Sequence, residues 1–378
     1  MPLPRTRPLA LAALLVAAAP AVVRAQSWFE EERSFSLYEE NDAFASSDSS
    51  YTQGLRLTWD FAVWSDRWNP AFRLTSLYAL RDRVTGKRTP AVTRPCRAQT
   101  PRSQRPCGTT SVGIGQTMYT PSNLLIEGPQ PNDRPYAGYL FAGVTRSVLF
   151  KRSQVSSDVI VGVTGPPSLA QLTQGLAHWT WSSDSPQPQG WDNQLRTMLH
   201  VTLLNQSVLP RVVEFCLKAK PCDGRYNEGR VADLTPRTEL VIGTLMTRVS
   251  PGLTLRLGYN FPDVTGLQRI PTTRSWGAEA RSLSPWVMGF GTYDHRFVGH
   301  NALLSGSVPD GDPGGWRSIG RIGTDHSFGE YAYGVAVGFR YATVVRQWVT
   351  RGGEYSPAGG AHRFGAMSLS IHAPARAP

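Results

Sequence analysis

Two neighbouring stretches of the chain predict a β-hairpin with an unusually polar turn: SLYEENDAF at residues 36–44 and YTQGLRLTW at residues 51–59. The second stretch alternates polar and apolar side chains, as a strand with one buried face does. A turn needs only one or two residues such as Asn, Asp or Gly for its geometry. This one adds a carboxylate pair, an amide, Asp48 and a hydroxyl. The surplus indicates a chemical role for Asn41, Asp42 and Thr52.

The first 25 residues predict a secretory signal peptide. Two arginines precede an apolar run at residues 9–23, and a small-residue cleavage site ends at Ala25, which is the pattern of a cleaved signal and not of a permanent membrane helix. We therefore expect one exported domain at residues 26–378. Cleavage removes three arginines and no acid, so the formal net charge falls from +11 to +8. A basic exported protein suits a phosphate-bearing lipid surface, and no Lys/Arg-rich helix or zinc-finger spacing favours nucleic acid.

The four cysteines fall into two pairs that are close in sequence. One pair is Cys96 and Cys107, and the other is Cys216 and Cys222. In an oxidising compartment this arrangement favours two disulfides within loops. A metal site is disfavoured because neither pair has C-x-x-C spacing or an adjacent histidine.

Short alternating runs recur along the rest of the chain, which has no later segment of the roughly 18 or more apolar residues that a transmembrane helix requires. Such runs, about ten residues long and bounded by Gly, Pro, Asn or Asp, are typical of membrane β-barrels. A soluble β-sandwich shows the same alternation. Aromatic residues near the predicted strand ends, such as Trp59, Trp286 and Tyr331, favour the barrel because they form girdles at membrane interfaces. The predicted runs are 55–63, 111–118, 139–150, 158–163, 195–204, 239–249, 253–261, 286–292, 331–344 and 363–371, and region 205–237 can be divided in more than one way.

Strand parity predicts which loops share a rim. In an antiparallel barrel successive connections alternate between the two ends. If the first strand rises from the periplasm, three connections share the outer rim: the turn at 41–52, the loop at 119–138 and the loop at 165–192. A long insertion at about residues 65–109 then lies on the periplasmic side.

The third of these loops predicts a short helix. Ser168 is a fair N-cap after two prolines, and Leu169, Leu172 and Leu176 mark an apolar stripe at helical spacing. Another face carries Gln171, Gln174 and His178. Parity thus gathers a candidate hydrolytic site at one end of the barrel, made of Asn41, Asp42, Thr52, Asp133, His178 and Asp184.

These residue types suit ester hydrolysis. A histidine can take a proton from water at neutral pH. Carboxylate and amide oxygens are hard ligands that suit calcium, which could stabilise the negative charge of a tetrahedral intermediate. Structural interpretations stay open, since an Asn-Asp pair before a turn is usually turn chemistry, and a histidine at the end of a helix is often a surface residue.

Seven short motifs follow one another in the N-terminal half: Asn41-Asp42, Tyr51-Thr52-x-Gly54, Tyr119-x-Pro121, Asp133-Arg134-Pro135-Tyr136-Ala137-Gly138, Gly165-Pro166, Gln174-x-x-x-His178 and Gly190-Trp191-x-x-Gln194. Their order and spacing over about residues 34–205 resemble the LpxR family of outer-membrane lipid A deacylases. The C-terminal half resembles the family only in the spacing of its predicted strands.

The resemblance implies a twelve-stranded transmembrane barrel in the outer membrane of a Gram-negative cell. It also implies calcium-dependent hydrolysis of the 3′-linked acyloxyacyl ester of lipid A, at a site between the barrel wall and a loop helix. His178 would be the general base, Asp42 and Asn41 would bind calcium, and Thr52 would line the site. Asp184 would supply the acid after the histidine, although it is one methylene shorter than the expected Glu.

The resemblance leaves other functions open. A phospholipase-like esterase could use the same histidine and calcium, and a barrel without catalysis could serve as a channel or a structural protein. The C-terminus, SIHAPARAP at residues 370–378, lacks the terminal aromatic residue typical of barrel assembly signals. We expect a monomer among outer-membrane lipids, with lipopolysaccharide as its substrate.

Overall fold

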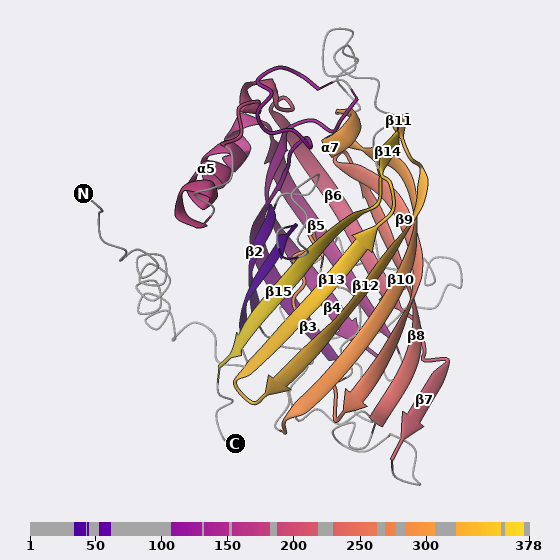
Figure 1. The fold of residues 1–378 in the computed structure, drawn as a ribbon. Coiled ribbons are helices and arrows are strands. Elements are labelled where there is room, and N and C mark those ends of the chain that lie inside the picture. Colours follow the sequence, from indigo (N-terminus) through magenta and orange to yellow (C-terminus); the bar gives the residue numbers. More distant parts are fainter. Residues whose placement is uncertain are drawn as a thin grey trace, which may run out of the picture.

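The computed structural model describes residues 34–42, 44, 53–61, 107–130, 132–150, 153–181, 187–217, 230–262, 269–276, 284–306, 323–356 and 360–373, without the side chains of residues 177–181 and 323. Within this part of the chain, twelve long antiparallel strands close into a barrel (Figure 1). Strands β6 and β8 pair directly, and β1 pairs with β15 to complete the ring. The twelve are β1 (Ser34–Asn41), β2 (Gln53–Phe61), β3 (Cys107–Tyr119), β4 (Ala137–Leu149), β5 (Gln154–Thr164), β6 (Met198–Val208), β8 (Arg230–Gly243), β9 (Met246–Tyr259), β10 (Trp286–Asn301), β12 (Ser327–Phe339), β13 (Ala342–Arg351) and β15 (His362–His372).

The remaining elements lie at the two ends of the barrel. Strand β7 (Val213–Cys216) pairs with β8 at one end, and β11 (Gly323–Thr324) pairs with β14 (Tyr355–Ser356) at the other. The helical elements are the 3-10 turns η5 (Pro166–Ser168) and η6 (Trp191–Asn193) and the helices α5 (Ala170–Trp181) and α7 (Ala302–Ser305). No helix among the described residues has the length and apolar character needed to cross a membrane.

Alternation along each strand gives the barrel an apolar outside and a polar inside. On β9, Leu253, Leu255 and Leu257 are 46, 46 and 53 % exposed, whereas Thr254 and Arg256 between them are 5 and 1 % exposed. Such a surface is stable only where lipid replaces water around it, because apolar side chains then meet apolar chains. The predicted barrel is therefore confirmed over the sandwich.

Buried ion pairs fill much of the interior. Glu330 on β12 accepts hydrogen bonds from Arg296 (2.7 Å), Arg351 (2.6 Å) and Arg269 (3.1 Å). On β8, Asp233 accepts bonds from both Nε and Nη2 of Arg256, at 2.8 and 2.5 Å. Because a buried charge is costly unless it is paired, these contacts require that neighbouring strands keep one register.

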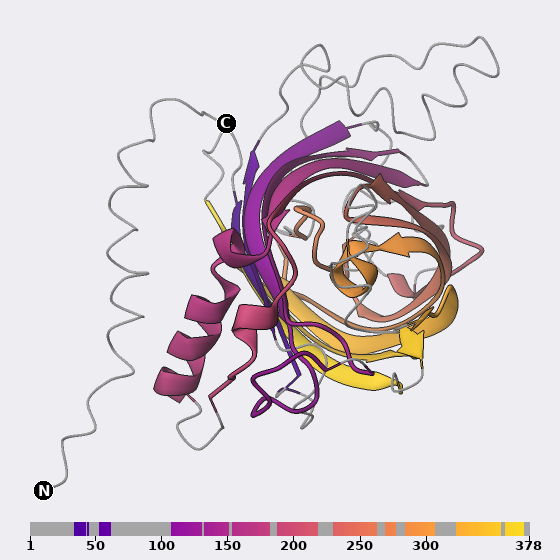
Figure 2. The same cartoon turned by 90° about the horizontal axis from the view of Figure 1, so that it is seen from above.

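Residues 269–276, which we call the plug segment, lie inside the ring, where Figure 2 shows orange segments among the strands. They belong to the connection between β9 and β10, and six of the eight are 4 % exposed or less. Three strands, β2, β4 and β5, hold the segment in place. The contacts are Arg56 Nη1 to the carbonyls of Thr272 (2.8 Å) and Arg269 (3.3 Å), Ser275 to Asp60 (2.6 Å), Thr273 with Thr145 (2.6 Å), and Thr272 to Asp158.

The predicted grouping of three connections at one end of the barrel is confirmed for their described residues, whereas the predicted insertion at about residues 65–109 lies outside the description up to residue 106. The β3–β4 loop and the β5–β6 loop with α5 lie at the upper rim in Figure 1, and the strand register puts Asn41, at the end of β1, in line with Gly138 at the start of β4. Two predicted runs are wrong in extent: 239–249 and 331–344 each contain a hairpin turn, between β8 and β9 and between β12 and β13. Neither turn carries the Gly, Pro, Asn or Asp that usually marks a chain reversal.

The cysteines agree with the predicted disulfides as far as they are described. Cys107 begins β3 and Cys216 ends β7, and both are disulfide-bonded. Their expected partners, Cys96 and Cys222, lie outside the described residues, as does the signal peptide.

Candidate functional site

A row of paired residues crosses the outer wall of the barrel just below the upper rim. Asn41 on β1 pairs with Gln53 on β2, Gln53 with Met118 on β3, and Met118 with Gly138 on β4. Side chains alternate between the two faces of β1, so Asn41, six residues after the outward-facing Phe35, also lies on the outer face. Tyr38 and Glu40 face the lumen and are 1 and 2 % exposed. The Asn41 end and the Gly138 end of the row therefore lie on the same lipid-facing surface.

Helix α5 docks on this surface at the Gly138 end. Gln116, which faces outward on β3, donates its side-chain amide to the carbonyl of Ser168 at 2.6 Å. A Cβ on Gly138 would lie 2.1 Å from Ser168 Oγ and 2.5 Å from the Cβ of Ala170. The close approach requires glycine here, because any side chain would push the first turn of α5 away from the wall. Figure 2 shows α5 outside the ring of strands.

The inner face of α5 carries a hydrogen-bonded amide. Trp191 Nε1, in η6, donates to Gln174 Oε1 at 2.7 Å, and both side chains are buried, at 2 and 1 % exposure. The Trp191 ring packs against Tyr136, with ring centroids 5.0 Å apart. Gln174 Nε2 has no hydrogen-bond partner among the described residues. The bond from Trp191 fixes the orientation of the amide, so Nε2 is held as a donor.

The start of α5 differs from the prediction. Ser168 lies in η5, and Leu169 follows it with φ of 60°. The carbonyl of Leu169 accepts the amide of Thr173 at 3.0 Å. The prediction that Ser168 caps the helix is therefore wrong, because the two prolines set a separate 3-10 turn first. Gln171 is exposed while Gln174 is buried, so the two amides do not share one environment.

The predicted site residues are only partly within the described chain. Asn41 and Asp42 lie at the rim end of β1, and Asp42 is 3 % exposed. His178 belongs to α5, one helical turn beyond Gln174, and its side chain lies outside the description. Thr52 and Asp184 lie outside the described residues. Their roles stay predictions.

Asp133, included in the predicted hydrolytic site, organises the rim loop instead. Its carboxylate accepts the backbone amides of Ser122 and Arg134, each at 2.7 Å, and the hydroxyl of Tyr355 at 2.7 Å. Partial burial alone would raise the pKa of Asp133, but these hydrogen bonds outweigh it and hold the pKa below its usual value. An ionised carboxylate with three donors stabilises the loop and is a poor base.

Arg134 faces the lumen. Its guanidinium lies over the ring of Tyr119, 4.1 Å from the centroid, and 3.8 Å from Glu354. The Arg134 side chain is 1 % exposed. Burial acts to raise the pKa of Glu354, but Arg351, His362 and Arg134 together lower it to about 2. The Arg134 guanidinium therefore belongs to the paired charges of the lumen.

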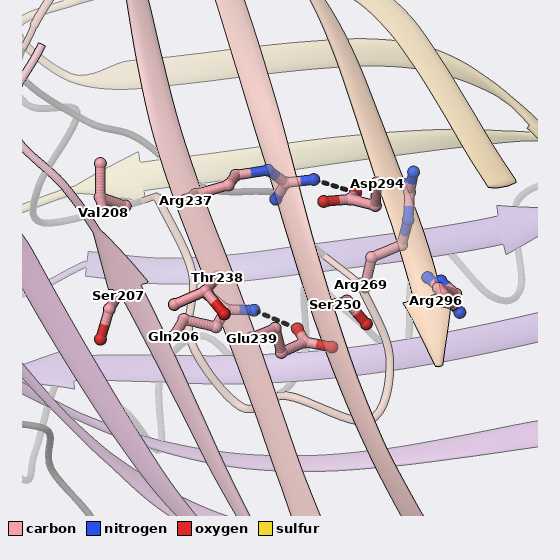
Figure 3. A pocket seen from close by; sticks show the side chains of 10 residues that line it. All are labelled: Gln206, Ser207, Val208, Arg237, Thr238, Glu239, Ser250, Arg269, Asp294 and Arg296. Carbon is pink, nitrogen blue, oxygen red and sulfur yellow. Dashed lines mark hydrogen bonds and ion pairs between the residues drawn. The ribbon is translucent and has the colours of Figure 1, made fainter. Parts of the chain in front are cut away.

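The lumen contains a separate polar pocket, shown in Figure 3. An ion pair between Arg237 and Asp294 lines it, together with a hydrogen bond from Gln206 to Glu239 at 2.8 Å. Arg248, outside the lining, is bonded to Glu239 as well. Val208, Ser250 and the plug residue Arg269 complete its wall. Because its charges are paired across strands, we interpret the pocket as a part of the packed barrel interior.

The donor types at the rim suit calcium. Asn41 and Asp42 supply adjacent amide and carboxylate oxygens, which are hard ligands. Among the described residues no group of three or more His, Cys, Asp or Glu could hold a metal ion. A calcium site here therefore needs further donors from the undescribed part of the chain, where Thr52 and Asp184 lie.

Known proteins share the sequence pattern and the fold of this chain. The family model described as outer membrane protein LpxR matches residues 9–373. Among solved structures, LpxR from Salmonella typhimurium is similar, with 16 % identity, 89 % of this chain and 99 % of that chain covered, and a TM-score of 0.64.

Other likenesses are weaker. The β domain of the Bordetella autotransporter BrkA has 10 % identity and covers 90 % of this chain and 97 % of its own, with a TM-score of 0.39. No curated protein matches the chain. The Salmonella structure shows the shared barrel fold, and the family model spans nearly the whole sequence. The chain therefore belongs to the LpxR family of outer membrane proteins.

Proposed function

We propose that this protein is a calcium-dependent lipid A 3′-O-deacylase that acts in the outer leaflet of the outer membrane. One observation carries the proposal: α5, with the buried amide of Gln174, docks on the lipid-facing wall of the barrel, at the rim that carries Asn41 and Asp42. A substrate anchored in the membrane by its acyl chains can reach this surface laterally.

The lumen is a poor alternative route. The plug segment and the paired charges around Glu330 occupy it among the described residues. At the upper end of the barrel in Figure 1, helix α7 packs Leu303 into an apolar cluster with Tyr139 and Phe141. A lipid with several acyl chains would have to displace these contacts, whereas the outer wall is already apolar.

The residues of the site have distinct proposed roles. His178 takes a proton from the attacking water, as a neutral imidazole can do. Gln174 Nε2 donates a hydrogen bond that orients the ester. Thr52 orients water or the ester beside Asn41.

Asn41, Asp42 and Asp184 would hold calcium through oxygen atoms. When bound, the ion supplies positive charge that stabilises the oxygen of the cleaved ester in the transition state. The chain itself fixes where that charge can lie, because Asn41 and Asp42 sit at the fixed end of β1, which pairs with β2 and β15 on either side.

A phospholipase-like activity is the second candidate, since the same wall meets glycerophospholipids. Purified protein in mixed micelles of lipid A and phospholipid separates the two candidates. We expect release of the 3′-linked acyloxyacyl group from lipid A, abolished by a calcium chelator and restored by added calcium. Release from phospholipid with lipid A intact would refute the proposed substrate.

A further inference from the structure

We propose that the apolar edge formed by Leu169, directly before α5, and by Leu172 and Leu176 within α5, called here the leucine edge, is immersed in the acyl-chain layer of the outer leaflet. The partner is the membrane lipid itself. The placement concerns the membrane position of the helix, and only its consequence for activity rests on the proposed function.

The leucine edge is exposed although it is strongly apolar. Leu169, Leu172 and Leu176 are 52, 60 and 53 % exposed, whereas Ala170 and Gln174 on the inner face are each 1 % exposed. The helix thus turns Ala170 and Gln174 toward the protein, while the three leucines face outward. In water this arrangement would be unfavourable, because apolar surface is left hydrated.

The sequence of the helix also suits lipid. The twelve residues AQLTQGLAHWTW contain no Asp, Glu, Lys or Arg. Residues 165–183 around them contain none either. Exposed helices of soluble regions normally carry charges on the outer face.

The helix lies against the lipid-facing belt. It packs on the outward faces of β3 and β4 through Gln116 and Gly138. Along these strands the outward side chains stay apolar and exposed, with Ile114 at 51 % and Val144 at 41 %. The leucine edge therefore continues an apolar surface that membrane lipid must already cover.

A second apolar contribution comes from the β3–β4 loop. Leu124 packs with Ala170 and Trp191 in a buried cluster. The next two residues, Leu125 and Ile126, are 63 and 41 % exposed. The same assembly thus presents apolar side chains from two separate loops, as an interfacial membrane contact does.

This placement has a consequence for substrate access. With the leucine edge among acyl chains, the inner face of α5 and the wall at Asn41 lie near the level of the ester bonds. The lipid need not leave the membrane to reach Gln174 and His178. An extramembrane helix would instead require the acyl chain to be pulled into water, at a cost that grows with each exposed methylene.

Fluorescence gives a direct test of the membrane position. A polarity-sensitive nitrobenzoxadiazole label is attached to Leu172→Cys and, as a matched control, to Asp192→Cys, which replaces an exposed carboxylate in η6. In vesicles with brominated acyl chains we expect quenching at position 172 and none at 192, with the reverse pattern for soluble iodide. Equal iodide quenching at both positions overturns the proposal.

A second arm uses activity. Leu172→Asp should lower deacylation in vesicles at least tenfold and leave deacylation in detergent micelles unchanged, while Gln171→Asp changes neither. Equal loss for Leu172→Asp in both media would contradict immersion. If lipid A is not the substrate, both media show no activity, and the quenching arm still decides the position of α5. Labelling Leu176→Cys repeats the measurement should the Leu172 variant fail to fold.

Discussion

The docking of α5 on Gly138 gives the sharpest structural prediction. In Gly138→Ala the new Cβ would lie 2.1 Å from Ser168 Oγ and 2.5 Å from Ala170 Cβ, whereas ordinary contact begins at 3.4 Å. The serine hydroxyl can rotate, but the methyl carbon of Ala170 is fixed to the helix. The first turn of α5 must therefore retreat by about 1 Å, and a misplacement of this size can cost about 100-fold in rate.

The stability cost should stay local. Overpacking at a close contact costs about 1–3 kcal/mol, and here it falls on the interface between α5 and the wall. The strand pairing of β4 with β3 and β5 is unaffected, because Gly138 faces outward. We expect deacylation by the purified variant to fall 10- to 100-fold (about 1.4–2.7 kcal/mol). The heat-modifiable migration in SDS gels that marks a folded barrel should stay unchanged.

Gly175→Ala is the matched control. Gly175 lies within α5, and nothing lies within 4 Å of a Cβ built there. Alanine is the better helix former by about 1 kcal/mol, so this variant should keep full activity. Unchanged activity in Gly138→Ala, or an equal loss in both variants, would refute the idea that close docking of α5 positions the site.

Three further predictions concern the hydrogen-bonded amide, the charged rim and the lumen. Trp191→Phe keeps a ring against Tyr136 but removes the donor to Gln174 Oε1. Because loss of such a bond costs about 0.5–1.5 kcal/mol, kcat should fall about 3- to 10-fold with KM unchanged. A change in KM alone would argue against an orienting role. Because the pKa of Glu354 is lowered to about 2 in the folded state, its ion pairs with Arg134 and Arg351 stabilise the barrel above the ordinary pKa of about 4.5 and lose that effect as pH falls toward 2. Thermal unfolding of wild type against Glu354→Gln should converge over this range, and a constant difference at all pH values would contradict the assignment. In planar bilayers the wild type should show no conductance, because the plug segment and the paired charges around Glu330 obstruct the lumen. Deletion of residues 263–283 should open ion-conducting channels, and conductance by the wild type would favour the channel hypothesis.

The sequence predicted the barrel because alternation and parity depend on local chemistry. Hydrophobic residues recur with period two wherever a strand faces lipid, and each reversal switches the rim, so the turn at Asn41 and the helix loop could be placed together. Strand ends were harder. The reversals at Thr244-Leu245 and at Arg340-Tyr341 contain no turn-forming residue, and hairpin geometry there comes from the strand register alone.

The interior could not be predicted for a different reason. A lumen-facing Arg or Glu has the same sequence pattern as a solvated one, so no signal marked Glu330 as the partner of three arginines. The pairing of Arg134 with Glu354 inside the barrel has no sequence signal for the same reason. The bond between Trp191 and Gln174 joins two loop segments, and only the folded arrangement of α5 and η6 reveals it. By contrast, the exposed leucines of α5 are visible in the sequence, but periodicity does not say whether they face protein or lipid.

The central claim is that the outer-wall site with His178 and Asp42 hydrolyses lipid A. Mass spectrometry of lipid A from cells expressing the protein tests it most directly, comparing wild type with His178→Ala and Asp42→Asn variants that fold equally well. The account predicts loss of the 3′-linked acyloxyacyl group with wild type, and intact lipid A with either variant. Intact lipid A with folded wild type and calcium present, or undiminished deacylation by His178→Ala, would contradict it.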